Sequence, residues 1–192
     1  AGTQVLHESA VAPVRERQIP LHIRSTFAPD APGTRIGFDA PASLVPSGVI
    51  GFAGRRPVSM LRVIFPENVE ETALREVHAC LNEHRIETFH SACGVEGLCL
   101  LLSSGAEADA LHATAEQLRE HFSGAQVKLR ENLAVLLALC RSTKDIPKLS
   151  AAIEASGAPV HHLVQTPPGA MFCVNDSQYE QALRAAYGAA FA

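Results

Sequence analysis

The sequence predicts an α+β protein made of two ferredoxin-like βαββαβ units, with the first unit inserted in the second. The first observation is an order of strand and helix patterns, β-α-β-β-α-β, that begins again about 75 residues later. The second is that the later copy lacks its final strand. The third is a strand pattern at residues 48–53, before the first copy, which can fill this gap. We therefore expect the two units to fold together.

The first unit is predicted from alternating and helical apolar patterns. In its first helix, Leu74, Val77 and Leu81 recur at helical spacing and form one apolar face. Glu70 and Glu71 precede that face, where the helix dipole favours negative charge. The predicted elements of this unit are a strand at 58–65, a helix at 70–85, strands at 86–91 and 96–102, a helix at 107–122 and a strand at 126–130.

The second unit repeats this order of strands and helices with different residues. Its first helix carries Ile146, Leu149 and Ile153 on one face, and its last helix begins near Tyr179, with Asn175 or Asp176 as the N-terminal cap. The predicted elements are a continuous apolar strand at 133–140, a helix at 145–156, strands at 160–165 and 170–175 and a final helix.

The N-terminal segment has a different character. Residues 5–23 predict a short helix followed by a strand, and residues 27–47 are crowded with prolines and glycines that exclude a helix and mark a boundary. These patterns divide the chain into residues 1–46, a first unit at 54–131 and a second unit made of 47–53 plus 132–192.

Composition excludes several classes of function. Hydrophobic residues make up 47% of the 192 residues and charged residues 19%, which is typical of a globular protein with a core. A net charge of −4 disfavours nucleic acid and anionic membranes as partners. Five cysteines without a C-x-x-C pair favour free thiols in a reducing cytoplasm, and no apolar run is long enough to predict a membrane span.

Both ends of the chain carry distinctive motifs. The N-terminal part carries Val5-Leu6-His7, then a segment from Ile19 and Pro20 to Thr26 and Phe27, and then Ala31-Pro32-Gly33-Thr34. These residues resemble the end of the catalytic domain of the aspartate kinase family, which leads into two tandem ACT domains. Phe172-Cys173-Val174 and the final helix resemble the last strand and helix of the family.

The resemblance implies that the chain is the C-terminal regulatory region of an aspartate kinase, with a stub of the kinase domain attached. The ACT pair would sense an end-product amino acid, lysine or threonine, and control phosphorylation of L-aspartate by ATP. ATP and Mg²⁺ would serve the parent enzyme, and the chain itself would need no cofactor. Its expected partners are the effector, its own kinase domain and a second copy bound through the ACT domains.

The sequence also departs from the family pattern. Gln4 stands where the family has a lysine near the nucleotide, and Glu8 and Ser9 replace a Pro-Arg pair. No phosphate-binding G-x-x-x-x-G-K-[ST] loop is present. Since phosphoryl transfer depends on such positioning elements, we assign no catalytic residue and expect the chain alone to be inactive.

The family resemblance places the effector against the loop after the first strand and the start of the second strand. Backbone N–H groups at a helix start can bind a carboxylate, and Glu67, Asn68 or Glu87 can face an ammonium group. The same acids are also explained by favourable interaction with the helix dipole. The candidate effector-binding residues are Pro66, Glu67, Asn68, Val69, Ile86, Glu87, Thr88 and Phe89.

Two pairs of adjacent residues, one of histidines and one of arginines, have simple structural explanations. His161 and His162 are adjacent on a predicted strand and point to opposite faces, so no metal site is predicted. Arg55 and Arg56 are placed in a solvated connecting turn. The alternative to an amino-acid sensor is a ligand-free ACT dimerisation scaffold of the same enzyme, with exposed strand edges as pairing surfaces.

Overall fold

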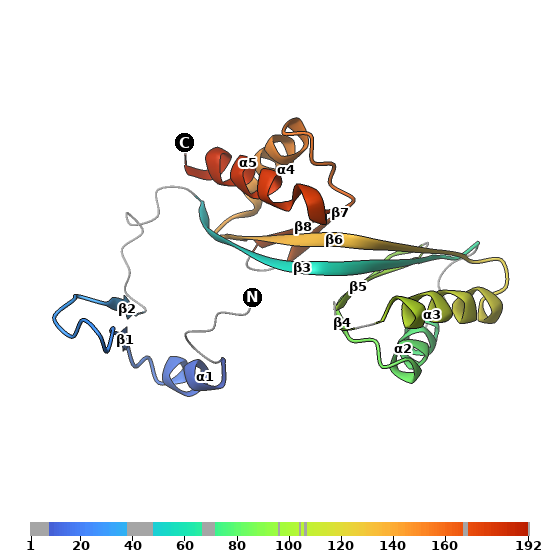
Figure 1. Cartoon of the computed structure of the whole chain (residues 1–192), viewed down its shortest axis with the longest axis horizontal. Coiled ribbons are helices and arrows are strands. Elements are labelled where there is room, and N and C mark those ends of the chain that lie inside the picture. The colour runs from blue at the N-terminus through green and yellow to red at the C-terminus, as the bar shows by residue number, and fades with distance from the viewer. Residues whose placement is uncertain are drawn as a thin grey trace. The chain divides into compact units, whose positions relative to one another are not determined.

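The computed structural model describes residues 8–37, 48–66, 72–95, 97–103, 105, 107–166 and 169–191. The chain divides into two compact units, Ala1–Ser47 and Gly48–Ala192, and each is described by itself. Figure 1 shows the helices and strands of both units.

The smaller unit consists of helix α1 (Glu8–Glu16) and a two-stranded antiparallel sheet of β1 (Leu21–Ile23) and β2 (Thr34–Ile36). The sequence predicts the helix and β1 but not β2, which lies among prolines and glycines. Gly33 permits the turn into β2, because its φ is +67° and a Cβ there would lie against the backbone oxygen of Ile23. The part of the predicted helix before Glu8 lies outside the described residues.

The larger unit is a six-stranded antiparallel sheet in the order β4-β5-β3-β6-β8-β7 with four helices. In Figure 1, α4 and α5 cover one end of the sheet, and α2 and α3 cover the other. Its elements are β3 (Val49–Ile64), α2 (Ala73–Glu83), β4 (Thr88–Cys93), β5 (Gly97–Ser103), α3 (Ala108–His121), β6 (Gln126–Cys140), α4 (Ile146–Ala155), β7 (His162–Thr166), β8 (Gly169–Asn175) and α5 (Tyr179–Phe191).

Two long strands, β3 and β6, join the halves of this sheet. Val49 to Arg55 pair with Val135 to Cys140, whereas Val58 to Ile64 pair with β5 and with the first half of β6. Each half of this sheet therefore contains four strands and is accompanied by two helices, as one βαββαβ unit requires. The early part of β3 supplies the strand that the sequence of the second βαββαβ unit lacks. The fold is the predicted pair of βαββαβ units, with the first inserted in the second.

The prediction of separate strands within β3 and within β6 is wrong. Residues 48–53 and 58–65 belong to one strand, and so do residues 126–130 and 133–140. Each strand absorbs its irregularity as a register shift, between Arg55 and Val58 in β3 and beside Asn132, with φ of +54°, in β6. The predicted turn at Arg55 and Arg56 is thus the middle of a strand.

Three apolar clusters hold the larger unit together. One cluster packs the second unit's strands under α4 and α5 around Phe172 and Leu149, and another packs the first unit's strands under α2 and α3 around Leu61 and Leu81. Leu136 and Leu100, on β6 and β5, are fully buried in these two clusters. Because successive side chains of a strand point to opposite faces, the residues next to these core positions face the side of the sheet away from the helices.

The third cluster lies on the sides of the two half-sheets that the helices leave uncovered. Its buried members come from strands of both units: Val58, Met60, Cys99, Leu101, Leu133, Val135 and Cys173. Leu101 and Leu133 are fully buried although no helix covers this side. We infer that the sheet curls, so that the helix-free sides of the two units pack against each other.

The predicted caps of the last helix are wrong. Neither Asn175 nor Asp176 makes a side-chain cap, and a short 3-10 turn, Asp176–Gln178, leads into α5. The Asn175 side chain instead accepts a hydrogen bond from Nε2 of His161 through Oδ1 at 2.7 Å and donates through Nδ2 to Oε1 of Gln178 at 2.6 Å. A tertiary partner has displaced the local cap.

Candidate functional site

The predicted effector-binding residues fall at three places in the first unit. Pro66 is exposed just beyond the end of β3, and Glu67, Asn68 and Val69 lie outside the described residues. Ile86 is buried in the cluster under α2 and α3, and its N–H donates to the Leu81 carbonyl at 2.8 Å. Its side chain is therefore a core residue and offers nothing to a ligand.

The next three predicted residues lie at the start of β4. Glu87 directly precedes β4 and is exposed, and its backbone carbonyl accepts the Ser103 N–H at 2.8 Å. The Thr88 hydroxyl oxygen is buried and has no hydrogen-bond partner. Since buried polar atoms are normally paired, this hydroxyl is a natural contact for a ligand.

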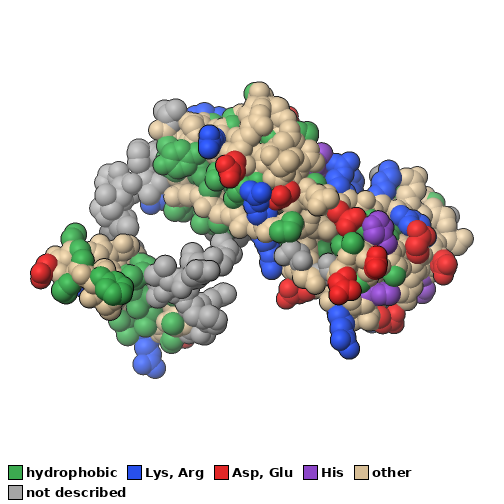
Figure 2. Space-filling view, in the orientation of Figure 1, with side chains coloured by type: hydrophobic (Ala, Val, Ile, Leu, Met, Phe, Trp, Pro, Cys, Tyr) green, Lys and Arg blue, Asp and Glu red, His purple; other side chains and the backbone are tan. Residues whose placement is uncertain are grey.

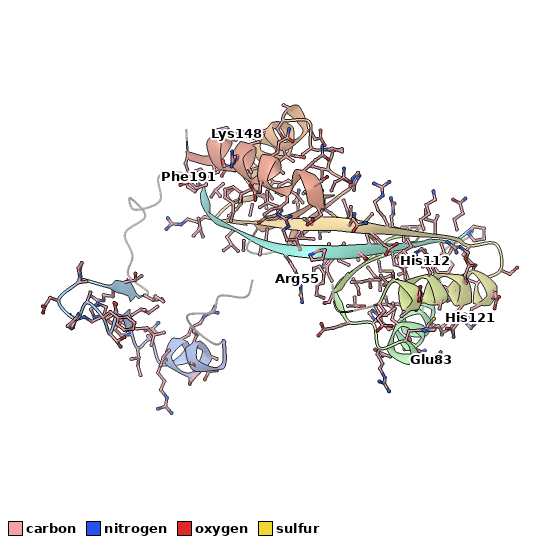
Figure 3. All side chains as sticks on the ribbon, in the orientation of Figure 1. Arg55, Glu83, His112, His121, Lys148 and Phe191 are labelled. Atoms are coloured by element: carbon pink, nitrogen blue, oxygen red, sulfur yellow. The ribbon has the colours of Figure 1, made fainter. Side chains whose placement is uncertain are left out.

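Phe89 packs against the third cluster, and the Arg55 guanidinium lies over its ring at 4.5 Å from the centroid. Figure 3 shows where Arg55 lies along β3. This cation–π contact joins the middle of β3 to the start of β4. Phe89 thus anchors β4 as a packing residue.

The two halves of the predicted site lie far apart in one unit. Ile64, near the end of β3, pairs with Gly97 of β5, whereas Thr88 pairs with Leu102 of β5. These β5 positions are five residues apart, which is about 17 Å along a strand at roughly 3.4 Å per residue. Pro66 and Thr88 therefore cannot contact the same amino acid within one unit.

The corresponding loop of the second unit follows β6. Ser142 and Lys144 are exposed there, and the Ser142 hydroxyl accepts the Lys144 backbone N–H at 3.3 Å. The Asp145 carboxylate lies against Gly48, where any Cβ would collide with it. This loop is compact and offers an exposed ammonium group in Lys144.

Arg55 and Arg56 form a junction between the two units that the sequence analysis missed. Arg56 donates from Nε to Oδ1 of Asp176 at 2.8 Å and from a terminal nitrogen to Oδ2 at 3.2 Å, and it lies 5.1 Å from the Tyr179 ring centroid. Arg55 thus contacts the first βαββαβ unit, and Arg56 contacts the second. Gly54 and Pro57 flank the pair and are common in turns, so the local sequence carries no signal of this role.

Only the second histidine of the predicted strand pair lies on β7, which begins at His162, and His161 directly precedes it. His161 contacts Arg130 through Nδ1 at 2.5 Å and Asn175 through Nε2 at 2.7 Å. The Nε2 of His162 is buried without a partner, and burial, followed by the nearby charges of Arg62 and His90, lowers the pKa of this imidazole. Within the described ranges, no group of three or more His, Cys, Asp or Glu side chains is arranged to hold a metal ion.

The five cysteines are all free thiols. Cys173 and Cys99 share the third cluster, and burial, followed by the charge of Cys99, raises the pKa of Cys173 to about 12. Cys93 is exposed. None of the helices in the described part of the chain is long and apolar enough to cross a membrane.

Comparison with solved structures assigns the fold to a class: paired ACT units of the kind found in aspartate kinase regulatory regions. Neither a family model nor a curated protein sequence matches the chain. The likeness therefore rests on structure.

Three solved structures illustrate the likeness. The aspartate kinase of Clostridium acetobutylicum matches 98% of this chain and 45% of its own, with a TM-score of 0.82 and 22% identity. E. coli aspartokinase III, in complex with lysine and aspartate, matches 98% and 42%, with a TM-score of 0.72 and 19% identity. The ligand-free regulatory subunit of Thermus thermophilus aspartate kinase matches 76% and 99%, with a TM-score of 0.61 and 20% identity.

The chain spans less than half the length of the full aspartate kinases that it matches, and nearly the whole length of the regulatory subunit. At these identities the likeness shows the fold.

Proposed function

We propose that the chain is the regulatory region of an aspartate kinase, in which two ACT units sense an end-product amino acid and control phosphorylation of L-aspartate by ATP. The observation that carries this proposal is the match over 98% of the chain at a TM-score of 0.82, which includes the segment before the ACT pair. The sequence motifs around Pro32 and Gly33 support it independently.

The proposed effector is lysine or threonine, and the proposed contacts are the predicted residues. The exposed Glu87 carboxylate suits an effector ammonium group, and the unpartnered Thr88 hydroxyl suits either end of an amino acid. Backbone N–H groups ahead of α2, in the segment of Glu67, Asn68 and Val69, would receive the carboxylate. The solved structure of E. coli aspartokinase III that matches 98% of the chain is a complex with lysine and aspartate.

We further propose that the site is completed by a second copy of the chain. Because the β5 partners of Ile64 and Thr88 lie about 17 Å apart along that strand, the loop of one copy and the β4 start of another would have to meet around one ligand. A twofold dimer through the ACT domains would form two such sites.

The remaining functions belong to the parent enzyme in this proposal. Phosphoryl transfer with ATP and Mg²⁺ would take place in the kinase domain, and no residue of this chain is assigned to catalysis. The five free thiols suit a cytoplasmic location. The limits proposed for the ACT units are residues 54–131 and 47–53 plus 132–192.

The test is a calorimetric and thermal-shift titration of the full chain with lysine, threonine, methionine and S-adenosylmethionine. We expect one of them to raise the melting temperature in a saturable way, as a ligand that binds the folded state must. Thr88→Val and Glu87→Gln should weaken that binding about tenfold or more, since each removes one polar contact. Glu154→Gln, an exposed change on α4, is the matched control.

Sedimentation of the same samples tests the shared site. We expect a dimer that the effector stabilises. A dimer that binds none of the four compounds would support the ligand-free scaffold instead, and a monomer that binds an amino acid tightly would contradict the shared site.

A further inference from the structure

The helix-free side of the sheet carries two like charges directly opposite each other. Arg62 of β3 pairs with Lys128 of β6, and on its other side Arg62 pairs with Cys99 of the third cluster. Opposed like charges on neighbouring strands destabilise a sheet. Features that break such a rule are expected where a function requires them.

Two histidines from the edge strands converge on the same place. His90 lies on β4 and His162 on β7, which are the two outer strands of the sheet. His90 pairs with Leu101, His162 with Cys173 and Arg62 with Cys99, and all three of these partners are buried together in the third cluster. The charges of Arg62 and His90 accordingly help to lower the pKa of His162. The curl of the sheet has thus brought three strands together around these side chains, which with Lys128 we call the basic cluster.

No acidic side chain balances the basic cluster within the described strands. On the helix-free side, β3 and β6 contribute Arg62, Lys128 and Arg130, while β5 and β8 contribute Cys99 and Cys173. Arg130 is engaged by His161, whereas Arg62 and Lys128 make no hydrogen bond or ion pair with described residues. In the face drawn in Figure 2, Asp and Glu gather over the lobe of α2 and α3, where His and some Lys and Arg side chains also lie.

The two imidazoles each leave a polar atom without a partner. The Nε2 atoms of His90 and His162 are buried and unpaired. A buried polar atom without a partner is unfavourable and is a place where a water or an ion can bind. Here the surrounding charge is positive, so the fitting occupant is an anion.

We propose that the basic cluster of Arg62, Lys128, His90 and His162 binds a phosphate-bearing anion on the helix-free side, between the two ACT units. A guanidinium presents paired donors that match phosphate oxygens, and a lysine ammonium adds a point charge. Imidazolium Nε2–H groups would supply two more donors. Phosphate fits better than a single carboxylate, because it offers more negative charge and more acceptors.

The bound anion would neutralise the Arg62 and Lys128 pair and link β4 with β7. Burial disfavours protonation of both His90 and His162 in the free protein, with Arg62 adding to this effect at His162, and a bound anion would favour it. The affinity should therefore rise as the pH falls through the imidazole range. Arg62 and Lys128 are exposed, so solutes can reach the cluster.

The test is calorimetric titration of the full chain with inorganic phosphate, pyrophosphate and ATP in chloride buffer at about pH 6 and about pH 8. We expect saturable binding that is about tenfold tighter at the lower pH, and a loss of about tenfold or more in Arg62→Gln and in Lys128→Gln. Binding of inorganic phosphate or pyrophosphate would identify a free phosphate ligand. Saturation by ATP alone would identify a nucleotide-borne phosphate.

Arg184→Gln is the matched control, since Arg184 is an exposed arginine of α5 whose nearest acid lies 3.8 Å away. The NMR signals of His90 and His162 should shift on addition of the anion, while unliganded Arg62→Gln keeps or raises the melting temperature. The proposal is overturned if no anion binds saturably, or if Arg184→Gln weakens binding as much as Arg62→Gln does.

Discussion

At the scale of single residues, two adjacent arginines join the two ACT units in different ways. Arg55 stacks on Phe89 of the first unit, and Arg56 forms a forked ion pair with Asp176 at the start of the second unit's last helix. Adjacent strand residues point to opposite sides, so one pair of side chains can reach both partners. The centre of β3 thus contacts both ACT units through these two side chains.

The cysteines should differ sharply in reactivity. The exposed thiol of Cys93 should be alkylated first, and Cys173 last, because burial raises the pKa of Cys173 to about 12 and keeps its thiolate scarce. Iodoacetamide labelling of the folded chain at about pH 8, followed by peptide mass spectrometry, measures the order. Equal labelling of both cysteines without denaturant would contradict the buried position of Cys173.

At the scale of elements, two glycines permit close approaches to a neighbouring strand or helix, and a third lies in open space. A Cβ on Gly169 would lie against the Ala138 carbonyl of the next strand, and one on Gly54 would lie against the Tyr179 hydroxyl of α5. A Cβ on Gly51 would meet nothing within 4 Å. Backbone cannot move aside as a side chain can, so these positions should tolerate alanine unequally.

We expect Gly169→Ala to lower the free energy of unfolding by about 3 kcal/mol or more and Gly54→Ala by about 1–2 kcal/mol. Gly51→Ala should change it by less than about 0.5 kcal/mol. Urea denaturation of the three variants gives the comparison. If Tyr179→Ala does not relieve part of the loss in Gly54→Ala, the inferred collision is not its cause.

The edge strands β4 and β7 should make stability depend on pH. Burial lowers the pKa of both His90 and His162 in the folded chain. As the pH falls through the ordinary histidine value of about 6.5, the unfolded chain binds more protons than the folded one. The free energy of unfolding should therefore decrease until the lowered folded-state pKa is reached, and become level below it.

This pH dependence can be measured by urea denaturation in phosphate-free buffer from about pH 8 to about pH 5. His162→Gln should flatten the decrease, and the control His84→Gln, directly after the end of α2, should keep the wild-type profile. A stability that rises on acidification in this range would show that His90 and His162 gain partners when protonated.

At the scale of the whole molecule, the nested arrangement should make residues 48–192 unfold as one unit. β3 and β6 each belong to both ACT units, and the third cluster draws buried residues from both. We expect one calorimetric transition for this part of the chain. Leu100→Ala in the first unit and Phe172→Ala in the second should each lower that same transition, by about 2–5 kcal/mol of unfolding free energy.

Two separable transitions, each sensitive to one of these substitutions, would contradict this coupling. Chemical shifts of residues in the unsubstituted unit provide the second readout, since local damage would leave them unchanged.

The order of elements and the nesting could be predicted from the sequence because both follow from local patterns. Apolar residues such as Leu74, Val77 and Leu81 repeat at the period of their own element, and that period survives without tertiary contacts. Strand limits were less predictable. Gly54 and Pro57 look like a turn locally, yet pairing with β6 extends β3 straight through them.

The candidate site was predictable in part for a similar reason. Resemblance placed Glu87 and Thr88 at a strand start, and the structure has them there. It could not reveal that Pro66 lies at the other end of the sheet, because the distance between two loops depends on strand direction and register. Phe89 and Ile86 also turned out to be packing residues, which is a property of burial.

The sequence by itself determined the secondary structure order, the repeat and the missing strand that predicts an insertion, because these are properties of neighbouring residues. Tertiary structure alone decided the curl of the sheet, the meeting of Arg62 with His90 and His162, and the separate partners of Arg55 and Arg56. Those contacts join residues up to 120 positions apart in the chain. Side chains so distant are brought together by register and packing, and no local pattern records them.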